Sequence, residues 1–320
     1  MESVLDMKGR TLSGRDDRIL VPAISRSGSS WLIGALGATP GTERWYEPDN
    51  IDADPSGQGE VGKSGFGPYP MIRPGEDGGV YRSLWDVVYK GALPYDFSTR
   101  LIPIARPLLK LPPSVLHPLV RLGSRALTSM QIGKRRIAAK SVYACFCLEW
   151  LVSQYDPKVV MIQRHPLSIA ASWRELGIPF FDLATRPELL ELYGDRYEGD
   201  PPSEEDSLMS RIAWHIGLLN MALGDALDRN SGWMLVNHED LCIDPEAKFK
   251  ALCEILGLQW SENVAAYLKA SNRPGTGLTP VRVTSEQVKR WKGRLTDEDM
   301  NEVLTVLSRF PRNGWIREPN

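Results

Sequence analysis

The stretch SRSGSSWL, residues 25–32, has the residue types of an anion-binding loop. It follows the apolar run RILVPAI (18–24), which reads as a buried strand, and precedes IGALGATPG (33–41), which reads as a short helix. A glycine and serine turn between a strand and a helix points several backbone N–H groups at an anion, and the helix dipole adds to their attraction. Hydroxyl groups and one guanidinium supply further donors in this loop: Ser27, Ser29, Ser30 and Arg26.

The loop is open to a simpler interpretation as well. Serine is a common residue at the start of a helix, so Ser29 or Ser30 could act only as a helix cap. The nucleoside-triphosphate motif G-x-x-x-x-G-K-[ST] requires a lysine after its glycine, and this stretch has none. An anion site here would therefore differ from an ATP phosphate loop.

A second motif, IQRHPLSIAAS (162–172), pairs a strand-end arginine with a helical serine. Arg164 ends an expected strand, and Pro166 suits the first turn of the next helix. Ser172 then lies roughly 9 Å further along the helix axis. Such a pair can hold a second phosphate, although a surface arginine and a serine bonded to its own helix backbone would give the same pattern.

Together, SRSGSSWL and RHPLSIAAS resemble the nucleotide signature of sulfotransferases that use 3′-phosphoadenosine-5′-phosphosulfate (PAPS). The resemblance implies that the first loop holds the 5′-phosphosulfate and that Arg164 and Ser172 hold the 3′-phosphate. An arginine in the loop and the downstream ERWYEP (43–48) resemble the carbohydrate-type and bacterial branches of this family. The loop residues implied to contact the donor are Arg26, Ser27, Gly28, Ser29, Ser30 and Trp31.

Two later segments resemble the same family. In LVNHEDLCIDPEAKFKALCEILGL (235–258), His238 stands where the family has an aromatic residue that contacts adenine. VKRWKGRLTDEDM (288–300) resembles the C-terminal segment that closes over the nucleotide. The resemblance offers Arg282, Lys289 and Lys292 as phosphate contacts, and each could instead be a solvated helix charge.

Lys140 is the first candidate for a catalytic cation. It ends the run RRIAAK (135–140), and α/β sheets place site residues at the carboxyl ends of their strands. The resemblance implies that a lysine here stabilises the sulfonate and its leaving oxygen, with Arg26 sharing that role. The alternative is a strand-end charge in solvent.

The general base is expected to be Glu47. Val142 stands where phenol-type members carry a histidine base, and a valine cannot take a proton. Some carbohydrate-type and bacterial members use a glutamate after the first helix, and Glu47 in RWYEPDN matches that place. We expect Trp45 and Tyr46 to desolvate this carboxyl and raise its pKa. The alternative is that Glu47 binds Arg44 or solvent. Three histidines are weaker candidates: His117, His165 and His215.

The apolar runs predict the fold class. Strands are expected at 18–24, 135–141, 158–164 and 232–240, and helices at 206–229, 244–256, 284–293 and 296–309. Asp244 is the expected N-cap of the second of these helices, Pro245 its first residue and Gly257 the residue after it. This alternation predicts a P-loop-like three-layer α/β fold with a central parallel sheet flanked by helices.

The chain is expected to be one domain, 1–320, with an inserted region of loops and short helices at 49–133 that shapes the acceptor site. Within it, 100–127 is apolar and basic without an acidic residue, which suits either a lid touching an anionic membrane or ordinary packing. Four aromatic residues could stack on an acceptor or fill the core: Tyr81, Trp85, Tyr89 and Tyr95. A further mobile loop is expected at 186–206.

Composition narrows the partners and the compartment. The formal net charge of −2 over 320 residues gives no reason to expect nucleic-acid binding. No stretch is apolar enough to span a membrane, and the N-terminus does not resemble a signal peptide. The cysteines form no C-x-x-C pair, so we expect them to be reduced and buried, without zinc, in a cytoplasmic protein. They are Cys145, Cys147, Cys242 and Cys253.

The sequence as a whole predicts a transferase that moves the sulfuryl group of PAPS to a hydroxyl of a carbohydrate, lipid or secondary metabolite. Transfer is expected to be in line, with Glu47 as base and with no metal required, as in the family that the motifs resemble. The alternatives are a P-loop kinase for a small molecule and a relative that binds 3′-phosphoadenosine-5′-phosphate (PAP) without catalysis.

Overall fold

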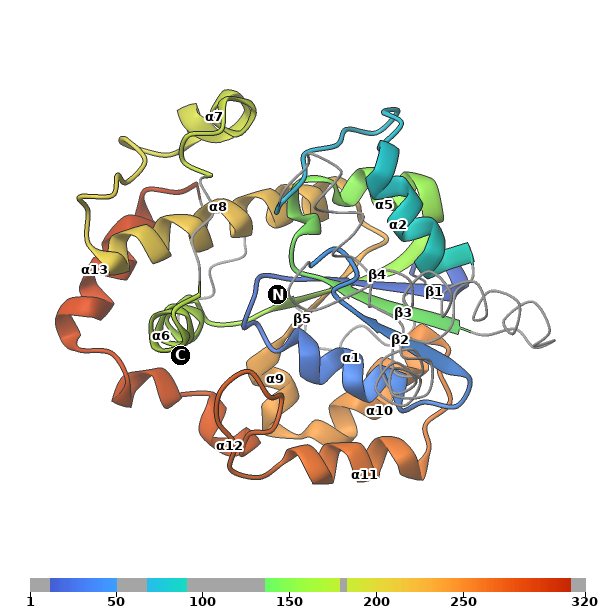
Figure 1. Cartoon of the computed structure of the whole chain (residues 1–320). Coiled ribbons are helices and arrows are strands. Elements are labelled where there is room, and N and C mark those ends of the chain that lie inside the picture. Colours follow the sequence, from blue (N-terminus) through green and yellow to red (C-terminus); the bar gives the residue numbers. More distant parts are fainter. Residues whose placement is uncertain (1–11, 51–67, 91–135, 179–182, 312–320) are drawn as a thin grey trace, which may run out of the picture.

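A parallel five-stranded sheet forms the centre of the protein (Figure 1). The computed structural model describes residues 12–50, 68–90, 136–178 and 183–311. The strand order is β2-β3-β1-β4-β5, and each neighbouring pair is parallel. The strands are β1 Arg15–Pro22, β2 Thr42–Tyr46, β3 Arg136–Ser141, β4 Pro157–Gln163 and β5 Met234–Asn237. The predicted fold class is confirmed.

Helices cover both faces of the sheet. Figure 1 shows α1, α10 and α11 on one face and α2, α5 and α8 on the other. The α-helices are α1 Ser29–Gly37, α2 Gly79–Lys90, α5 Leu148–Tyr155, α6 Pro166–Leu176, α7 Pro187–Tyr193, α8 Leu208–Arg229, α9 His238–Ile243, α10 Pro245–Leu256, α11 Glu262–Ser271, α12 Thr284–Gln287 and α13 Asp297–Ser308. Short 3-10 helices are η1 Ala144–Phe146, η2 Gly194–Arg196 and η3 Arg290–Gly293.

The strands divide the core into two apolar layers because successive side chains point to opposite faces. In β1, Ile19 and Val21 pack with α1 and α10, whereas Leu20 packs with α2, α5 and α8. All seven residues of β4 are buried, as expected for a strand covered on both faces. Layers on both sides of a parallel sheet leave its carboxyl edge free to carry a site.

The long predicted elements are confirmed. The four expected strands correspond to β1, β3, β4 and β5, and α10 has the expected ends. The Asp244 side chain accepts from the Ala247 backbone N–H (3.1 Å), Pro245 begins the helix, and Gly257 follows it with φ 68°. The four cysteines are free and buried, as expected.

Several elements differ from the prediction. Strand β2 was not expected: at five residues, TERWY, on the edge of the sheet and mostly half-buried, it lacks the apolar run that marks the inner strands. The helix expected at 284–293 is divided into α12 and η3, and the loop expected at 186–206 contains α7 and η2. Within the described ranges no helix is long and apolar enough to cross a membrane.

The inserted region is described only in part. Its residues 68–90 include α2, where Tyr81, Trp85 and Tyr89 are each at most 4% exposed and pack in the core. These three rings therefore have a packing role. Tyr95 and the basic stretch 100–127 lie outside the described residues, so the expectations for them stay predictions.

A candidate anion-binding and catalytic site

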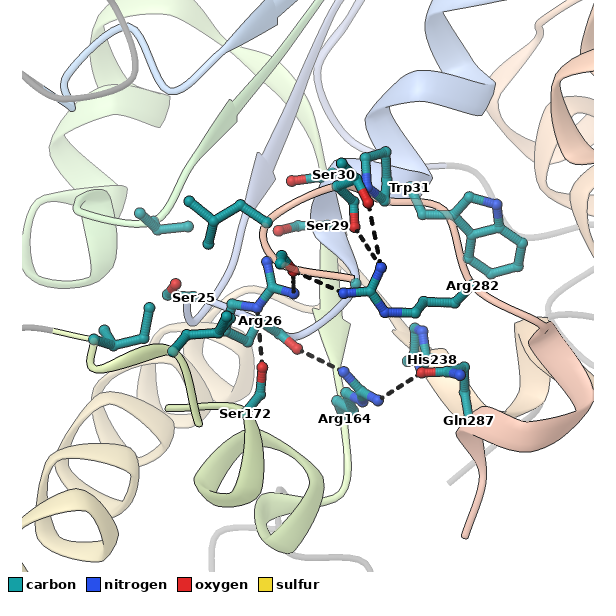
Figure 2. Close-up of a pocket in the computed structure, with 18 of the residues that line it drawn as sticks. Ser25, Arg26, Ser29, Ser30, Trp31, Arg164, Ser172, His238, Arg282 and Gln287 are labelled. Atoms are coloured by element: carbon teal, nitrogen blue, oxygen red, sulfur yellow. Dashed lines mark hydrogen bonds between the residues drawn. The ribbon is translucent and has the colours of Figure 1, made fainter. Parts of the chain in front are cut away.

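A cavity of about 600 Å³ opens at the carboxyl edge of the sheet. The loop after β1, the ends of β2, β3 and β4, and the segment 275–282 all contribute to its wall. Figure 2 shows that residues far apart in the sequence point toward one another across it. The parallel register places these strand ends together, with Tyr46 beside Lys140 and Pro22 beside Ser141.

The loop after β1 has an unusual backbone. Gly28 caps α1 with φ 94°, and Arg26 has φ 71°, a conformation uncommon for residues other than glycine. A Cβ atom at Gly28 would lie 2.2 Å from Cδ2 of His238, so the close approach of that ring also requires glycine. The loop is therefore held in a conformation that only this sequence allows, directly before a helix N-terminus.

Two arginines from distant segments meet in front of this loop. The Arg26 Nε donates to the Ser172 Oγ (3.1 Å), and its Nη2 donates to the Gly277 carbonyl (3.3 Å). Arg282 donates to the same carbonyl through its Nη2 (2.7 Å). Burial lowers the pKa of Arg26, and the nearby charges of Arg282 and Arg294 lower it further. Like charges gathered at partly buried positions favour an anion between them.

Arg164 extends this cluster of cations. Its Nη1 donates to the Arg26 carbonyl (3.0 Å) and its Nη2 to Oε1 of Gln287 (3.4 Å). Its Nε is buried without a hydrogen-bond partner among the described residues. Burial and the charges of Arg26 and Arg294 lower the pKa of Arg164 to about 10, although the Glu239 carboxylate opposes them. A buried guanidinium with an unused donor fits the recognition of an anionic ligand.

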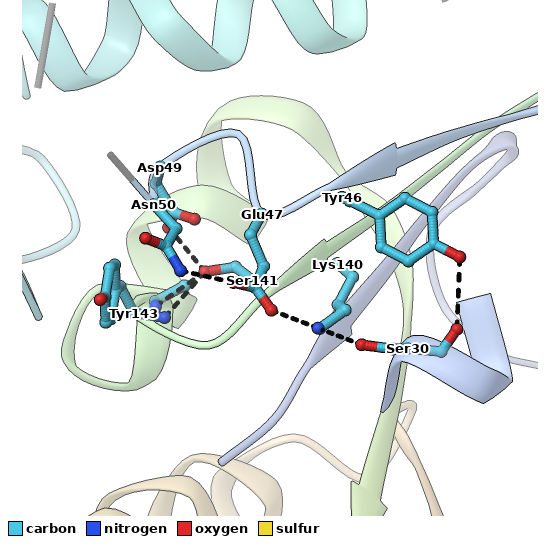
Figure 3. A network of polar contacts seen from close by, with 9 residues as sticks. Ser30, Tyr46, Glu47, Asp49, Asn50, Lys140, Ser141 and Tyr143 are labelled. Atoms are coloured by element: carbon cyan, nitrogen blue, oxygen red, sulfur yellow. Dashed lines mark hydrogen bonds and ion pairs between the residues drawn. The ribbon is translucent and has the colours of Figure 1, made fainter. Parts of the chain in front are cut away.

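Lys140 and Glu47 form an ion pair at the other side of the cavity (Figure 3). The Lys140 ammonium also donates to Ser30 Oγ (2.8 Å), and Asn50 donates to Glu47 Oε2 (2.5 Å). The pair joins the end of β3 to the first residue after β2, and the serine joins it to the anion loop.

The expected rise in the pKa of Glu47 is wrong, because the pKa is lowered. Burial alone would raise it, but the charge and hydrogen bond of Lys140 and the hydrogen bond from Asn50 outweigh burial. The two neighbouring rings make polar contacts of their own. Trp45 is buried and its Nε1 donates to Glu43 (3.0 Å), while the Tyr46 hydroxyl donates to the Ser30 carbonyl (3.4 Å).

Comparison with known proteins was made by sequence and by structure. No family model and no curated protein matches the sequence. Among solved structures, the sulfotransferase domain from the curacin biosynthetic pathway is similar with a TM-score of 0.50 and 11% identity, covering 94% of this chain and all of that domain. Mouse sulfotransferase SULT7A1 complexed with PAP gives a TM-score of 0.42, with 13% identity and coverage of 97% and 90%. The sulfotransferase domain of the Synechococcus PCC 7002 olefin synthase also gives 0.42, with 14% identity and coverage of 95% and 98%.

The chain has the fold of a sulfotransferase domain. The curacin-pathway domain carries this conclusion, since the similarity extends over the whole of that domain. At 11% identity the similarity shows the fold alone. The role of each residue therefore has to be argued from its own contacts.

Most residues singled out in the sequence meet at this cavity of the sulfotransferase fold. Eleven of them line it: Arg26, Gly28, Ser29, Ser30, Trp31, Glu47, Lys140, Arg164, Ser172, His238 and Arg282. Ser27 does not line it; its buried hydroxyl has no hydrogen-bond partner among the described residues. Lys292 does not line it either, and its Nζ lies 5.5 Å from the centre of the Trp291 ring.

The histidines differ in their surroundings. His238 is 5% exposed, and burial followed by the charge of Arg164 lowers its pKa well below the usual value, so the ring is neutral. His165 stacks on Trp291 with centroids 5.0 Å apart, and His215 is packed in α8 with its Nδ1 2.9 Å from the Arg211 carbonyl. Neither lines the cavity, and His117 lies outside the described residues.

The sequence did not point to two arginines in the wall of the cavity. Arg290 and Arg294 line the cavity, whereas Lys292 between them does not. Arg290 begins the short 3-10 helix η3 and Arg294 follows its last residue, and neither was among the charges that the sequence resemblance offered. The remaining wall includes apolar and aromatic residues: Tyr46, Tyr69, Val142, Tyr143, Leu176 and Ile178. It also includes two polar ones, Asn50 in contact with Glu47 and Glu175 paired with Arg294.

Proposed function

We propose that the protein transfers the sulfuryl group of PAPS to a hydroxyl of an acceptor molecule. The observation that carries this proposal is the arrangement of charge in one cavity of a sulfotransferase fold. Arg26 and Arg164 meet at the anion loop, and the buried Arg164 Nε has an unused donor. A carboxylate, Glu47, lies on the same wall in contact with Lys140. Such a cavity has cations for a phosphate and sulfate donor and a base for an acceptor hydroxyl.

The cationic side of the cavity fits a nucleotide with two separate anionic groups. Arg164 and Ser172 would bind the 3′-phosphate, the first through its free Nε and the second through the hydroxyl that now accepts from Arg26. The loop amides with the Ser29 and Ser30 hydroxyls would bind the 5′ end. Burial and then the charges of neighbouring arginines lower the pKa values of Arg26 and Arg164, and an anion between the two would offset the repulsion. Arg282, Trp31 and His238 would complete the wall around the nucleotide.

In the reaction the donor supplies the activated sulfuryl group. The acceptor oxygen forms a bond to sulfur while the bond from sulfur to the donor phosphate oxygen breaks, and Glu47 takes the acceptor proton. Lys140 would stabilise the charge on the leaving oxygen, with Arg26 assisting. When the Lys140 ammonium turns toward the donor, Glu47 loses the charge that lowers its pKa, while its burial remains. Glu47 therefore becomes a stronger base once the donor is bound.

The acceptor would carry its hydroxyl on an apolar or aromatic body. Tyr69 is 3% exposed, and it packs against Tyr143 with ring centroids 4.9 Å apart. Val142, Leu176 and Ile178 also contribute apolar surface to the cavity. A lipid or secondary metabolite matches this wall better than a highly charged carbohydrate does.

The four free, buried cysteines fit the reducing cytoplasm, which we propose as the compartment.

Calorimetric titration with PAP, with ATP and ADP in parallel, tests this function. We expect PAP to bind more tightly than either. Arg164→Ala should weaken binding about 30-fold or more, since removing one member of a buried charged contact costs about 2 kcal/mol or more. Arg136→Ala is the matched control, because Arg136 begins β3 at the opposite edge of the sheet and donates to the Gly257 carbonyl (3.1 Å). A preference for ATP, or equal affinity in Arg164→Ala, would contradict the proposal.

A further inference from the structure

Behind the Glu47–Lys140 pair lies a second carboxylate that the proposed reaction does not use. Asp49 is 2% exposed and does not line the cavity. Its Oδ2 accepts hydrogen bonds from the Ser141 hydroxyl (2.6 Å) and from the Tyr81 hydroxyl (2.8 Å). Figure 3 shows Asp49 and Ser141 beside Glu47 and Lys140. A buried carboxylate beside a site needs an explanation, because burial disfavours its charge.

Within the described ranges, the turn that carries Glu47 has little backbone support. It follows β2, which is an edge strand and is paired on one side only, with β3. The Glu47 N–H donates to the Lys140 carbonyl (2.9 Å), and the Asn50 N–H donates to the Glu47 carbonyl (2.9 Å). Glu47 also has φ 43°, a conformation that costs free energy for a residue with a side chain. Side chains are therefore needed to hold this turn in place.

Two side-chain contacts join the turn to the end of β3, on its opposite faces. Glu47 pairs with Lys140 at the cavity, and Asp49 binds Ser141 on the side of α2, which contributes Tyr81. Neighbouring residues of a strand point to opposite faces, so Lys140 and Ser141 necessarily hold the turn from both sides. We name the four residues Glu47, Asp49, Lys140 and Ser141 the strand-end clasp.

The hydroxyl of Ser141 uses all of its hydrogen-bonding capacity in the clasp. It donates to Asp49 and accepts from the backbone N–H groups of Tyr143 (3.1 Å) and Ala144 (3.0 Å). The same hydroxyl thus fixes the chain after β3, where Val142 and Tyr143 line the cavity. Its proton can therefore only be donated to an acceptor, and an ionised carboxylate is the strongest acceptor available.

We propose that Asp49 is a positioning residue that holds Glu47 against Lys140 by anchoring the turn to Ser141 and Tyr81. The consequence for catalysis rests on the proposed function of Glu47. Burial, with the Glu47 charge adding to it, raises the pKa of Asp49 to about 6, although the two hydroxyl donors oppose the rise. Among the described residues, the other titratable groups that interact with Asp49 are Tyr69, Tyr81, Cys145 and Cys147, and all have raised pKa values, so they stay neutral.

Backbone hydrogen exchange, read by mass spectrometry, tests the positioning role without an acceptor. In Asp49→Asn and in Tyr81→Phe we expect the amides of 46–50 to exchange faster than in the wild type. Tyr155→Phe is the matched control: Tyr155 is equally buried in the same aromatic cluster and donates to Asp86 (2.9 Å), away from the cavity. Its 46–50 amides should exchange as in the wild type. Unchanged exchange at 46–50 in both Asp49→Asn and Tyr81→Phe would overturn the proposal.

A second arm compares donor binding with turnover. The acceptor in this assay is an alcohol that the wild type sulfates. We expect the kcat of Asp49→Asn to fall up to about 100-fold, because Glu47 would be displaced from its catalytic position. The Kd for PAP should be unchanged. The kcat/KM of the wild type should rise as the pH increases past about 6, where Asp49 ionises. This rising limb of the pH profile should be absent in Asp49→Asn, which has no carboxyl at that position. Equal kcat and the same limb in the variant would overturn the proposal. A wild type that does not bind PAP would refute the proposed function, and the exchange result would still decide the role of Asp49.

Discussion

At the scale of single residues, the Glu47–Lys140 pair is the centre of the candidate site. In the free protein the proposed base is paired, because Lys140 contacts Glu47 directly and lowers its pKa. Lys140 also contacts Ser30 of the loop after β1 (2.8 Å). An anionic donor in that loop would compete with Glu47 for the ammonium, and under the proposed function this would couple donor binding to base strength through one side chain.

Glu47→Gln tests the base. Glutamine keeps the shape of the side chain but cannot take a proton, so we expect kcat to fall by about 100- to 10,000-fold. PAP should bind at least as tightly as in the wild type, since the Lys140 ammonium no longer has a carboxylate partner. Radiolabelled sulfate transfer measures the first quantity and calorimetry the second. Turnover that survives in Glu47→Gln would assign the base to another group.

The charge of Asp49 should lower the stability of the folded protein at neutral pH, although the same residue holds the Glu47 turn in place. The pKa of its carboxyl is 3.8 in the unfolded chain, and burial raises it to about 6 in the folded protein. Between these values the folded protein binds the extra proton, so stability falls as the pH rises and stays lower above that range. Asp49→Asn lacks this penalty. We expect its Tm to equal or exceed that of the wild type at a pH of about 7.5, with the difference shrinking toward about pH 4.

A marked loss of Tm in Asp49→Asn at neutral pH would show that the hydrogen bonds from Ser141 and Tyr81 outweigh the cost of burying the charge. Asp86→Asn is the control. Asp86 also accepts from a tyrosine hydroxyl, but its side chain is 34% exposed, so burial costs its charge much less and the Tm should change little on substitution.

The sequence predicted which residues line the cavity better than it predicted their contacts. Arg164 and Ser172 were paired by spacing, and both line the cavity, yet Arg26 is what connects them: it donates to Ser172 and accepts from Arg164. Glu47 was expected beside aromatic rings and lies against Lys140. Asp49 gave no signal at all, because a carboxylate in a polar turn looks the same in sequence whether it is exposed or buried.

At the scale of elements, the junction of β1 and α1 determines the geometry of the anion loop. Gly28 has φ 94°, and a Cβ there would lie 2.2 Å from the His238 ring at the start of α9. The strand, the loop and the helix are therefore positioned by one residue without a side chain. The sequence showed the glycine, but the ring that approaches it comes from a segment about 200 residues away, which no local pattern reveals.

Gly28→Ala tests this junction. It adds both backbone strain and a clash with His238, so we expect a loss of roughly 2 kcal/mol or more in the free energy of unfolding, together with weaker PAP binding. Gly41→Ala is the matched control, since Gly41 has φ 71° but nothing lies within 4 Å of an added Cβ. It should lose only about 1 kcal/mol and bind PAP normally. Urea denaturation and calorimetry measure the two effects, and equal losses in both variants would refute the clash.

Other elements show where sequence patterns reach their limit. The strands β1, β3, β4 and β5 were recognisable from their apolar runs, and β4 and β5 are buried throughout although β5, like β2, lies at an edge of the sheet. Strand β2 was missed because its residues, TERWY, are mostly half-buried and form no such run, yet it leads directly to Glu47. The break between α12 and η3 was missed as well.

At the scale of the whole molecule, charge and apolar surface are separated within one cavity. The chain has a net charge of only −2, but arginines from four distant segments converge on the anion loop: Arg26, Arg164, Arg282, Arg290 and Arg294. Beside the Glu47–Lys140 pair the wall includes Tyr69, Val142 and Tyr143, with Asn50 as a polar member. The fold brings these parts together because the carboxyl ends of β1, β2, β3 and β4 share one edge of the sheet.

This separation predicts which alcohols are sulfated. We expect decanol to have a kcat/KM at least about tenfold higher than triethylene glycol monomethyl ether, a chain of the same length that also ends in a primary hydroxyl. Each methylene that leaves water for an apolar wall contributes about 0.8 kcal/mol, whereas an ether oxygen buried there without a donor loses its hydration. Transfer of radiolabelled sulfate from PAPS measures both rates under one set of conditions. The ether oxygen makes the hydroxyl of the glycol ether slightly more acidic, which favours the glycol ether, so a preference for decanol reports the body of the acceptor. A preference for the glycol ether would show that the wall near Glu47 receives a polar acceptor.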